Sequence, residues 1–347
     1  MNQTASQFPA EWRKVLAACV GVPLAVGLIV LAFLWPVKTS EPRNLPVGIV
    51  GPPPAVENFQ AAMAENSPGL LDLVEAADRS EAVSQVERRL TFGAIILAAP
   101  PDAPEVLTAP AGSPMASQML AGLASQLQAK AAEGAAASGG IDGTPQVQVT
   151  PIVPLSESDQ AGSGLAAASF PLVIGGAVGG VIIALLVAGA ARRATALLGF
   201  SLVTGLVMAL VLGSWFGYLP GTFVASWLAV AVTVLAISAV ITGCAAVAGR
   251  AGLGLAVVLT ILVANPLSAA QMPWQFLAQP WGAIGQLLPP GAGNWLVRSV
   301  SYFPTADNTK QWLVLGVWAV LGLALVGLSH LRRDTAKPLL PVSVLNH

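Results

Sequence analysis

Side chains that could do chemistry are scarce in this sequence of 347 residues. Both cysteines, Cys19 and Cys244, lie in apolar runs, where a buried thiol is normally inert. The two histidines, His330 and His347, have no second ligand at a spacing that suits a metal ion. We therefore predict that the chain has no metal site.

Motifs for catalysis and for nucleotide binding are also missing. A phosphate-cradling loop needs Gly-Lys followed by Ser or Thr, and none of the five lysines follows a glycine. The sequence shows no nucleophile elbow, and the apolar runs contain no Ser/His or paired-Asp arrangement. We predict a protein that is not an enzyme, with no catalytic residues and no cofactor. An enzyme acting within the membrane ranks as a distant third hypothesis.

Composition points to an integral membrane protein. Hydrophobic residues make up 55% of the chain and charged residues 10%, against roughly 25% charged in an ordinary soluble domain. The mean hydropathy is +0.72. The formal net charge of -1 gives no basic excess that would suit nucleic acid. The lipid bilayer is therefore the first predicted partner.

Apolar runs of about 20 residues are long enough to cross the hydrocarbon core of a bilayer. Six runs qualify, at residues 15–36, 169–191, 195–217, 222–248, 253–272 and 311–331. The first run follows two basic residues, as a signal peptide would. Its apolar core is longer than the roughly 7–15 residues of a signal sequence, and no A-x-A pattern follows it, so we predict a retained anchor.

The positions of the basic residues predict the orientation of these spans. Basic residues occupy the N-terminus, two short loops and the C-terminus: Arg13, Lys14, Arg192, Arg193, Arg250, Arg332 and Arg333. With six crossings all of them share one face, which the positive-inside rule makes cytoplasmic. The predicted order is a cytoplasmic N-terminus at 1–14, the first span, an extracytoplasmic segment at 37–168, a five-helix domain at 169–331 and a cytoplasmic tail at 332–347. An Ala-, Gly-, Val- and Pro-rich chain with few lysines suggests a bacterial source, hence the bacterial plasma membrane.

The predicted external segment holds 14 of the 17 acidic residues. Short apolar runs typical of strands recur at 45–50, 92–97, 105–108 and 147–150. Helical faces alternate with them: Val56, Phe59 and Met63; Val83, Val86 and Leu90; Met115, Met119, Leu123 and Leu127. This alternation predicts a small α/β domain.

Local signals refine the α/β prediction. Asp78 and Glu81 have the spacing of a capping box, and Ser113-Pro114 suits the start of a third helix. The stretch 133–143 is rich in Ala, Gly and Ser and is interpreted as a flexible loop. Residues 87–89 (Glu-Arg-Arg) are interpreted as a solvated helix face rather than a ligand site.

Small residues and prolines mark three places in the membrane region. Gly175, Gly176, Gly179 and Gly180 form two overlapping G-x-x-x-G pairs, which suit packing within one bundle or, alternatively, a protomer interface or moving joint. Asn265-Pro266 marks either a functional kink or the outer end of the fifth span.

The third place is residues 273–304, which are too apolar for a free loop and too broken for a span. An external interfacial or re-entrant element is predicted there, and it contains Pro289, Pro290, Gly291, Gly293 and Arg298. The Arg298 side chain is expected to snorkel to lipid phosphate or to pair with the external domain. Direct contact with substrate is the minority interpretation.

The order of these segments resembles the permeases of type-2 ABC exporters, closest to the phage-infection-protein (Pip/YhgE-like) and nitrosoguanidine-resistance-like membrane proteins. The resemblance covers nearly the whole chain and rests on Leu45-Pro-Val-Gly-Ile-Val50, Gly93-Ala-Ile-Ile-Leu97, Leu288-Pro-Pro-Gly-Ala-Gly293, Leu296-Val-Arg-Ser299 and Tyr302-Phe303. It implies export of an amphiphilic or cell-envelope compound, driven by a separate ATPase subunit, by two permease protomers forming a homo- or heterodimer.

The predicted cytoplasmic loops at Arg192, Arg193 and Arg250 would face that ATPase. The absence of Asp, Glu, Lys and Arg from the six runs agrees with an external energy source, because proton- or ion-driven transport normally needs ionisable groups in the membrane. The alternative hypothesis is a non-transporting envelope receptor or scaffold whose external domain binds a partner.

Overall fold

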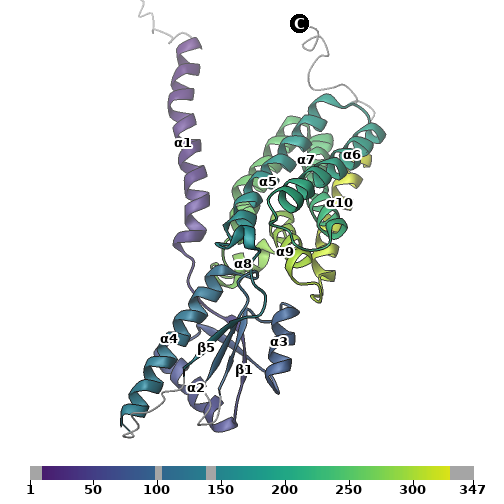
Figure 1. Cartoon of the computed structure of the whole chain (residues 1–347). Helices are drawn as coiled ribbons and strands as arrows, with labels where there is room; N and C mark the ends of the chain where they lie inside the picture. Colours follow the sequence, from purple (N-terminus) through teal and green to yellow (C-terminus); the bar gives the residue numbers. More distant parts are fainter. Residues whose placement is uncertain (1–9, 98–103, 138–145, 329–347) are drawn as a thin grey trace, which may run out of the picture.

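The computed structural model describes residues 10–97, 104–137 and 146–328 (Figure 1). Within these residues, five helices are long and apolar enough to cross a membrane. A small α/β domain lies at one end of the helical bundle, and the start of α1 and the end of α10 lie at the opposite end (Figure 1). The predicted tail at 332–347 and residues 1–9 lie outside the described residues.

The α/β domain is built on a five-stranded sheet in the order β2-β1-β3-β4-β5. The strands are β1 (Leu45–Val50), β2 (Leu71–Glu75), β3 (Gly93–Ile96), β4 (Glu105–Thr108) and β5 (Gln148–Pro151). All neighbouring strands run parallel except β3 and β4. Four of these strands coincide closely with the predicted apolar runs.

Helices cover both faces of the sheet. Phe59 of α2 (Pro53–Asn66) and Leu120 of α4 (Pro114–Ala137) pack with Leu45 and Ile95 on one face. Ala82 of α3 (Arg79–Glu87) packs with strand residues on the other face.

The two predicted helix starts, at Asp78 before α3 and at Ser113 before α4, are found in the structure. The Asp78 carboxylate accepts a hydrogen bond from the Glu81 N–H at 2.8 Å, and the Glu81 carboxylate accepts one from the Ala77 N–H. The Ser113 hydroxyl accepts a hydrogen bond from the Ala116 N–H at the start of α4. These caps satisfy backbone donors that have no partner inside the helix.

Three local predictions differ from the structure. Strand β2 was not among the predicted strands; it is a half-exposed edge strand. Helix α3 ends at Glu87, so Leu90 is exposed and not on its packed face. Helix α4 runs on to Ala137, so the predicted flexible loop begins at least five residues too early, and its remainder lies outside the described residues.

An ion pair ties α3 to the sheet and gives a pH-dependent prediction. The Arg79 guanidinium donates two hydrogen bonds to the Glu105 carboxylate, at 2.7 and 2.8 Å, and these lower the pKa of Glu105 below its ordinary value. Because the folded pKa is lowered, the pair stabilises the fold fully above the unfolded pKa, and this stabilisation is lost as the pH falls through the folded pKa. Since Arg79 is half exposed, the pair contributes only about 0.5–1 kcal/mol.

We therefore expect Glu105→Gln to lower thermal stability at pH 7, and this loss to shrink as the pH falls through the folded pKa of Glu105. Thermal unfolding followed by circular dichroism at pH 7 and at a pH below that folded pKa measures the difference. Arg79→Met serves as the control, because it removes the other partner and should show the same loss at pH 7. An equal destabilisation by Glu105→Gln at both pH values would contradict the assignment.

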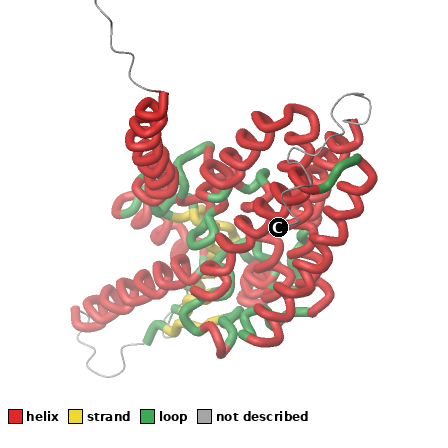
Figure 2. The backbone as a smooth tube through the Cα atoms, turned by 90° about the horizontal axis from the view of Figure 1, so that it is seen from above, coloured by secondary structure: helices red, strands yellow, loops and turns green. Residues whose placement is uncertain are grey.

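The helical bundle forms around α7, which contacts the other long helices of the bundle. Its members are α5 (Ser163–Leu186), α6 (Ala190–Ala209), the π-helix η2 (Leu210–Trp215) that extends α6, α7 (Phe223–Val258), the π-helix η3 (Leu259–Ala264) that extends α7, and α10 (Thr309–Leu328). Figure 2 shows these helices grouped together, with the first helix, α1, standing apart.

The continuous run of α7 and η3, Phe223–Ala264, covers the predicted span 222–248 and the first twelve residues of the predicted span 253–272, and accounts for the count of five helices instead of six. The predicted end at residue 272 is wrong, because the helical run stops at Ala264. Its helical geometry is broken at Gly249, which has φ 61° and ψ -141°. A Cβ on Gly252 would lie 2.2 Å from the Cys244 carbonyl oxygen, eight residues earlier. In a continuous helix that separation is about 12 Å. The chain therefore folds back on itself at Gly249.

The glycines of the predicted G-x-x-x-G pairs lie mostly against helices of the same chain. A Cβ on Gly180 would lie 2.8 Å from the Ser238 carbonyl of α7, and one on Gly179 would clash with the Phe200 ring of α6. Gly176 faces Ile237, whereas Gly175 has no neighbouring atom within 4 Å. Three of the four glycines thus permit close packing inside the bundle.

Helix α1 (Ala10–Lys38) makes its aromatic contacts with the rest of the protein near its C-terminal end. Phe33 packs edge-on against Phe170 of α5, and Trp35 against Trp281. The most apolar 18-residue window of this helix is not buried at all by the rest of the chain. Its apolar side chains are therefore available to lipid.

The segment between η3 and α10 links the bundle to the α/β domain. It contains η4 (Pro266–Ser268), η5 (Trp274–Phe276), α8 (Trp281–Gly285) and α9 (Pro289–Tyr302). The π-helical run ends at Ala264 with Asn265 as its C-cap, and a 3-10 turn starts at Pro266, so this dipeptide marks the end of the helix rather than a kink within it. Most residues of α9 are buried, since α9 packs between the bundle and the domain.

Candidate functional site

The domain and the bundle share one continuous interior at α9. Trp295 of α9 packs against the main core of the α/β domain, and Phe303 packs with Val86, Ala109 and Ala111. Leu296 and Val297, on other faces of α9, belong to the core of the bundle. Helix α9 therefore helps to fix the position of the domain relative to the bundle, together with η5, whose Phe276 is buried in the main core of the domain.

Arg89 crosses this junction from the domain side. It follows the end of α3 with a left-handed backbone, φ 59°. Its Nη1 donates to the Trp295 carbonyl at 3.0 Å and to the Ser299 hydroxyl, and its guanidinium lies 3.6 Å from the centre of the Trp295 ring. The prediction of a solvated face is wrong for Arg89, although the neighbouring Glu87 and Arg88 are exposed.

Arg298 crosses the junction in the opposite direction. This residue of α9 is 8% exposed, and its Nη1 donates to the carbonyl of Ala111 in the α/β domain at 2.9 Å. Of the alternatives predicted for Arg298, contact with the domain is thus the one that the structure shows, through a backbone carbonyl instead of a carboxylate. Both arginines lie at the same junction.

The two arginines have no paired carboxylate. Within the described residues, neither forms an ion pair. Asp159 acts on Arg298 at longer range, but its carboxylate accepts the N–H groups of Gly164 and Leu165 at the start of α5. Burial lowers the pKa of the Arg89 guanidinium well below its ordinary value, and the positive charge of Arg298 adds to this effect. The junction therefore carries buried positive charge with little compensation.

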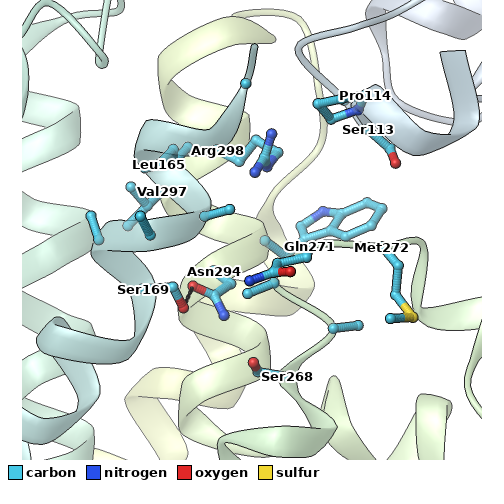
Figure 3. Close-up of a pocket in the computed structure, with 18 of the residues that line it drawn as sticks. Ser113, Pro114, Leu165, Ser169, Ser268, Gln271, Met272, Asn294, Val297 and Arg298 are labelled. Carbon is cyan, nitrogen blue, oxygen red and sulfur yellow. Dashed lines mark hydrogen bonds between the residues drawn. The ribbon is translucent and has the colours of Figure 1, made fainter. Parts of the chain in front are cut away.

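A cavity of about 350 Å³ opens beside these arginines. Its wall is formed by residues from the α/β domain, from the N-terminal half of α5, from the segment 268–274 and from α9. Arg298, Asn294 and Gln271 extend toward a common space, with Ser113 and Pro114 on the side of the domain (Figure 3). The volume lies at the lower end of the range typical of small-molecule pockets, about 300–1,000 Å³.

The middle of the cavity is polar. The Ser169 hydroxyl of α5 donates to the Asn294 Oδ1 of α9 at 2.6 Å (Figure 3). The Nδ2 of Asn294 is buried and has no hydrogen-bond partner. An unpaired buried amide donor costs free energy, and such a group is suited to a ligand that brings an acceptor.

Another part of the wall is apolar. Leu172 of α5, Leu212 of η2 and Val230 of α7 line this part, whereas Leu165 of α5 lies beside Arg298 (Figure 3). The cavity therefore has a cationic end next to the α/β domain and an apolar end within the helices. Such an arrangement can accept a molecule with a polar or charged head and an apolar body.

The predicted external residues of α9 serve to position this helix. Pro289 and Pro290 occupy its first turn, where a missing N–H is tolerated. A Cβ on Gly291 would lie 2.1 Å from the Gly285 carbonyl, and one on Gly293 would lie 2.3 Å from the Thr233 side chain of α7. The glycines thus allow the close approach that brings Arg298 to the junction.

The predicted ATPase-facing arginines lie in different environments. Arg193 is buried, and its guanidinium donates to the carbonyls of Val187 at 2.7 Å and Ala184 at 3.0 Å, which closes the C-terminal end of α5. Arg192 and Arg250 have exposed side chains. Arg192 and Arg250, but not Arg193, are therefore accessible to a partner at that end of the bundle.

Sequence reasoning missed four residues of the site: Arg89, Ser169, Gln271 and Asn294. Ser169 lies at the start of a predicted apolar run, and a serine there is a weak indication of a binding site, because solvent-exposed helix ends also contain serine. Asn294 gave a stronger indication, since it lies in the same unusual segment as Arg298. The burial of Arg89 had no local signal, because its partners are about 200 residues away.

Comparisons of the chain with protein-family models, with curated proteins and with solved structures found no match. The resemblance to type-2 ABC exporter permeases therefore stays a prediction, and the functional argument below rests on the geometry of this chain.

Proposed function

We propose that the chain crosses the membrane six times, with both termini in the cytoplasm and the α/β domain outside. The helical run Phe223–Ala264 has 42 residues and would be about 63 Å long if straight, twice the hydrocarbon thickness of about 30 Å. The reversal at Gly249 turns this run into two antiparallel segments. With six crossings, the basic residues Arg192 and Arg250 lie on the same side as the termini.

Exposed aromatic rings support this placement. The exposed fractions of Trp35, Trp215 and Trp281 are 40%, 83% and 42%, and these residues lie at or near the ends of apolar helices. Tryptophan is enriched where hydrocarbon meets the headgroups. A belt of rings near the domain-facing end of the bundle fits an outer membrane–water interface.

We propose that the protein is the permease subunit of an exporter of an amphiphilic or cell-envelope compound. The observation that carries this proposal is the cavity at the junction of domain and bundle, with its cationic end outside and its apolar end inside the helices. A binding site at the junction of domain and bundle is accessible to a molecule that leaves the membrane toward the outside. Among the residues that the structure describes, α5, α6, α7 and α10 contain no Asp or Glu that could relay protons, which agrees with an energy source in a separate ATPase subunit.

Copurification tests the ATPase. The full chain, extracted in mild detergent from its native host, is expected to retain a nucleotide-binding subunit, and the double variant Arg192→Glu/Arg250→Glu is expected to lose it. Arg88→Glu, an exposed arginine on the opposite side of the proposed membrane, is the matched control and should retain the subunit. Absence of an ATPase from the unaltered protein would overturn the exporter proposal and favour a receptor or scaffold.

A further inference from the structure

We propose that the junction cavity binds a single-chain amphiphile through an anionic headgroup, a phosphate or a carboxylate, held by Arg89 and Arg298. This inference deepens the proposed function and rests on it for the direction of transport. The binding itself depends only on the cavity and the charges around it.

The first argument is the charge at the cavity. Arg89 and Arg298 both line it, and neither has an ion-pair partner within the described residues. A buried guanidinium normally has a carboxylate partner, because removing its charge from water is costly. A ligand with a negative headgroup would supply the missing charge.

The second argument is the number of unused donors. A guanidinium has five N–H groups. The hydrogen bonds of Arg89 and Arg298 to protein acceptors all start from their Nη1 atoms, and the buried Nε of Arg89 has no partner. The Nδ2 of Asn294 is a further buried donor without a partner. Guanidinium groups match the oxygens of phosphate and carboxylate better than an ammonium does.

The third argument is the shape of the remaining space. Apolar side chains of the bundle, including Leu172 and Leu212, line another part of the wall, together with the small polar residue Ser268. An inorganic anion would fill only the cationic end and leave this apolar part empty. A ligand with a hydrocarbon chain attached to its anionic group would fill both parts.

The alternative is that Arg89 has only a structural role and holds the domain against α9. The two interpretations predict different effects of Arg89→Met. If Arg89 is lost, the Ser299 hydroxyl can rotate to donate to the carbonyl of Trp295, four residues earlier in the same helix, so both groups keep a partner. Removal of an uncompensated buried charge also relieves a desolvation cost. A ligand-binding arginine can therefore be replaced by methionine with little loss of stability in the unliganded protein.

The experiment uses the full chain in phosphatidylcholine nanodiscs with three probes: dodecyl phosphate, dodecylphosphocholine and inorganic phosphate. Binding is measured by calorimetry and by the ligand-dependent rise in the unfolding temperature. We expect saturable binding of dodecyl phosphate, binding of dodecylphosphocholine that is roughly tenfold weaker or absent, and binding of inorganic phosphate that is weaker still. Equal affinity for inorganic phosphate and dodecyl phosphate would overturn the amphiphile assignment.

Variants distinguish a ligand-binding role of Arg89 from a purely structural role. Arg89→Met is expected to weaken dodecyl phosphate binding roughly tenfold or more while the unliganded unfolding temperature stays close to that of the parent. Arg89→Lys, which keeps the charge, should show an intermediate affinity, and the exposed neighbour Arg88→Met should bind like the parent. Unchanged affinity in Arg89→Met, or a large loss of unliganded stability, would overturn the role of Arg89.

The binding experiment and the copurification experiment can fail independently of each other. If the protein binds dodecyl phosphate saturably but copurifies with no ATPase, the proposal of an anion-binding site stands and the exporter proposal is rejected. If an ATPase copurifies but dodecyl phosphate and dodecylphosphocholine bind equally well, the exporter proposal stands and the anion-binding site is rejected.

Discussion

Replacement of Gly322 by alanine is expected to destabilise the bundle by about 1–3 kcal/mol, the usual cost of overpacking a tight interior. Gly322 lies on α10, where its backbone crosses α7 at close range. An added Cβ would lie 2.4 Å from the backbone carbon of Ala239 and 2.6 Å from the nitrogen of Val240. Because these neighbours are backbone atoms, no side-chain rotation can relieve the contact.

The opposite face of the same crossing shows the same constraint. A Cβ on Gly243 of α7 would lie 2.6 Å from the carbonyl oxygen of Gly322. The two helices thus approach each other glycine to glycine, which is the closest packing that two helices can achieve. Separating them would disturb the α7 residues that line the cavity.

Gly316 provides the matched control for this prediction. It lies two turns earlier on α10 and has no atom within 4 Å of its expected Cβ. Since alanine favours helix more than glycine does, Gly316→Ala should leave stability unchanged or raise it by up to about 1 kcal/mol. Thermal unfolding in nanodiscs measures both variants. If both variants shift stability in the same direction, the proposed crossing of α7 and α10 is wrong.

Replacement of Gly249 by alanine is the second change with a large expected effect. The backbone there has φ 61° and ψ -141°, a region that is essentially restricted to glycine. We expect a loss of about 1–3 kcal/mol, the usual cost of forcing a residue into a sparsely populated conformation. The loss falls on the reversal that, in the proposed topology, makes two crossings of one long helical run, so the effect also tests that topology.

Gly254 is the control for Gly249, because it lies on the same helix, has no neighbouring atom within 4 Å and has no positive φ. Gly254→Ala should behave like an ordinary helix substitution, neutral or slightly stabilising. Thermal unfolding gives the stability of each variant. Protease or label accessibility at Arg250 reports whether the turn lies on the side that the proposed topology makes cytoplasmic. A Gly249→Ala variant as stable as the parent would argue for a continuous helix at this position.

Elements with strong local signals were predictable from the sequence. Asp78 and Glu81 cap α3 because the spacing of a capping box needs no distant partner. Strand β1 was found because its run 45–50 is apolar, follows polar residues and is ended by Gly51 and three prolines. Strand β2 was missed because Leu71–Glu75 mixes apolar and acidic residues without a regular alternation over only five positions. Its placement depends on pairing with β1, which the local sequence does not encode.

The candidate site was predictable only in part. Arg298 stood out because a lone cation in an apolar segment needs a reason, and the structure places it at the junction. Arg89 did not stand out, since its chain neighbours are charged and its burial follows from contacts with α9. The reversal at Gly249 was anticipated as a loop between two spans. The cavity itself depends on how four separate segments meet, and no single stretch of sequence contains that information.

The most direct test of the central claim, that the junction cavity binds an amphiphile, is photolabelling. Dodecyl phosphate with a diazirine in its alkyl chain is added to the full chain in nanodiscs, irradiated and mapped by mass spectrometry. We expect the label on cavity residues of α5 and η2, around Leu172 and Leu212, and its loss when excess unlabelled dodecyl phosphate is present. Label spread over lipid-facing α1 and α10, and unaffected by the competitor, would contradict the account.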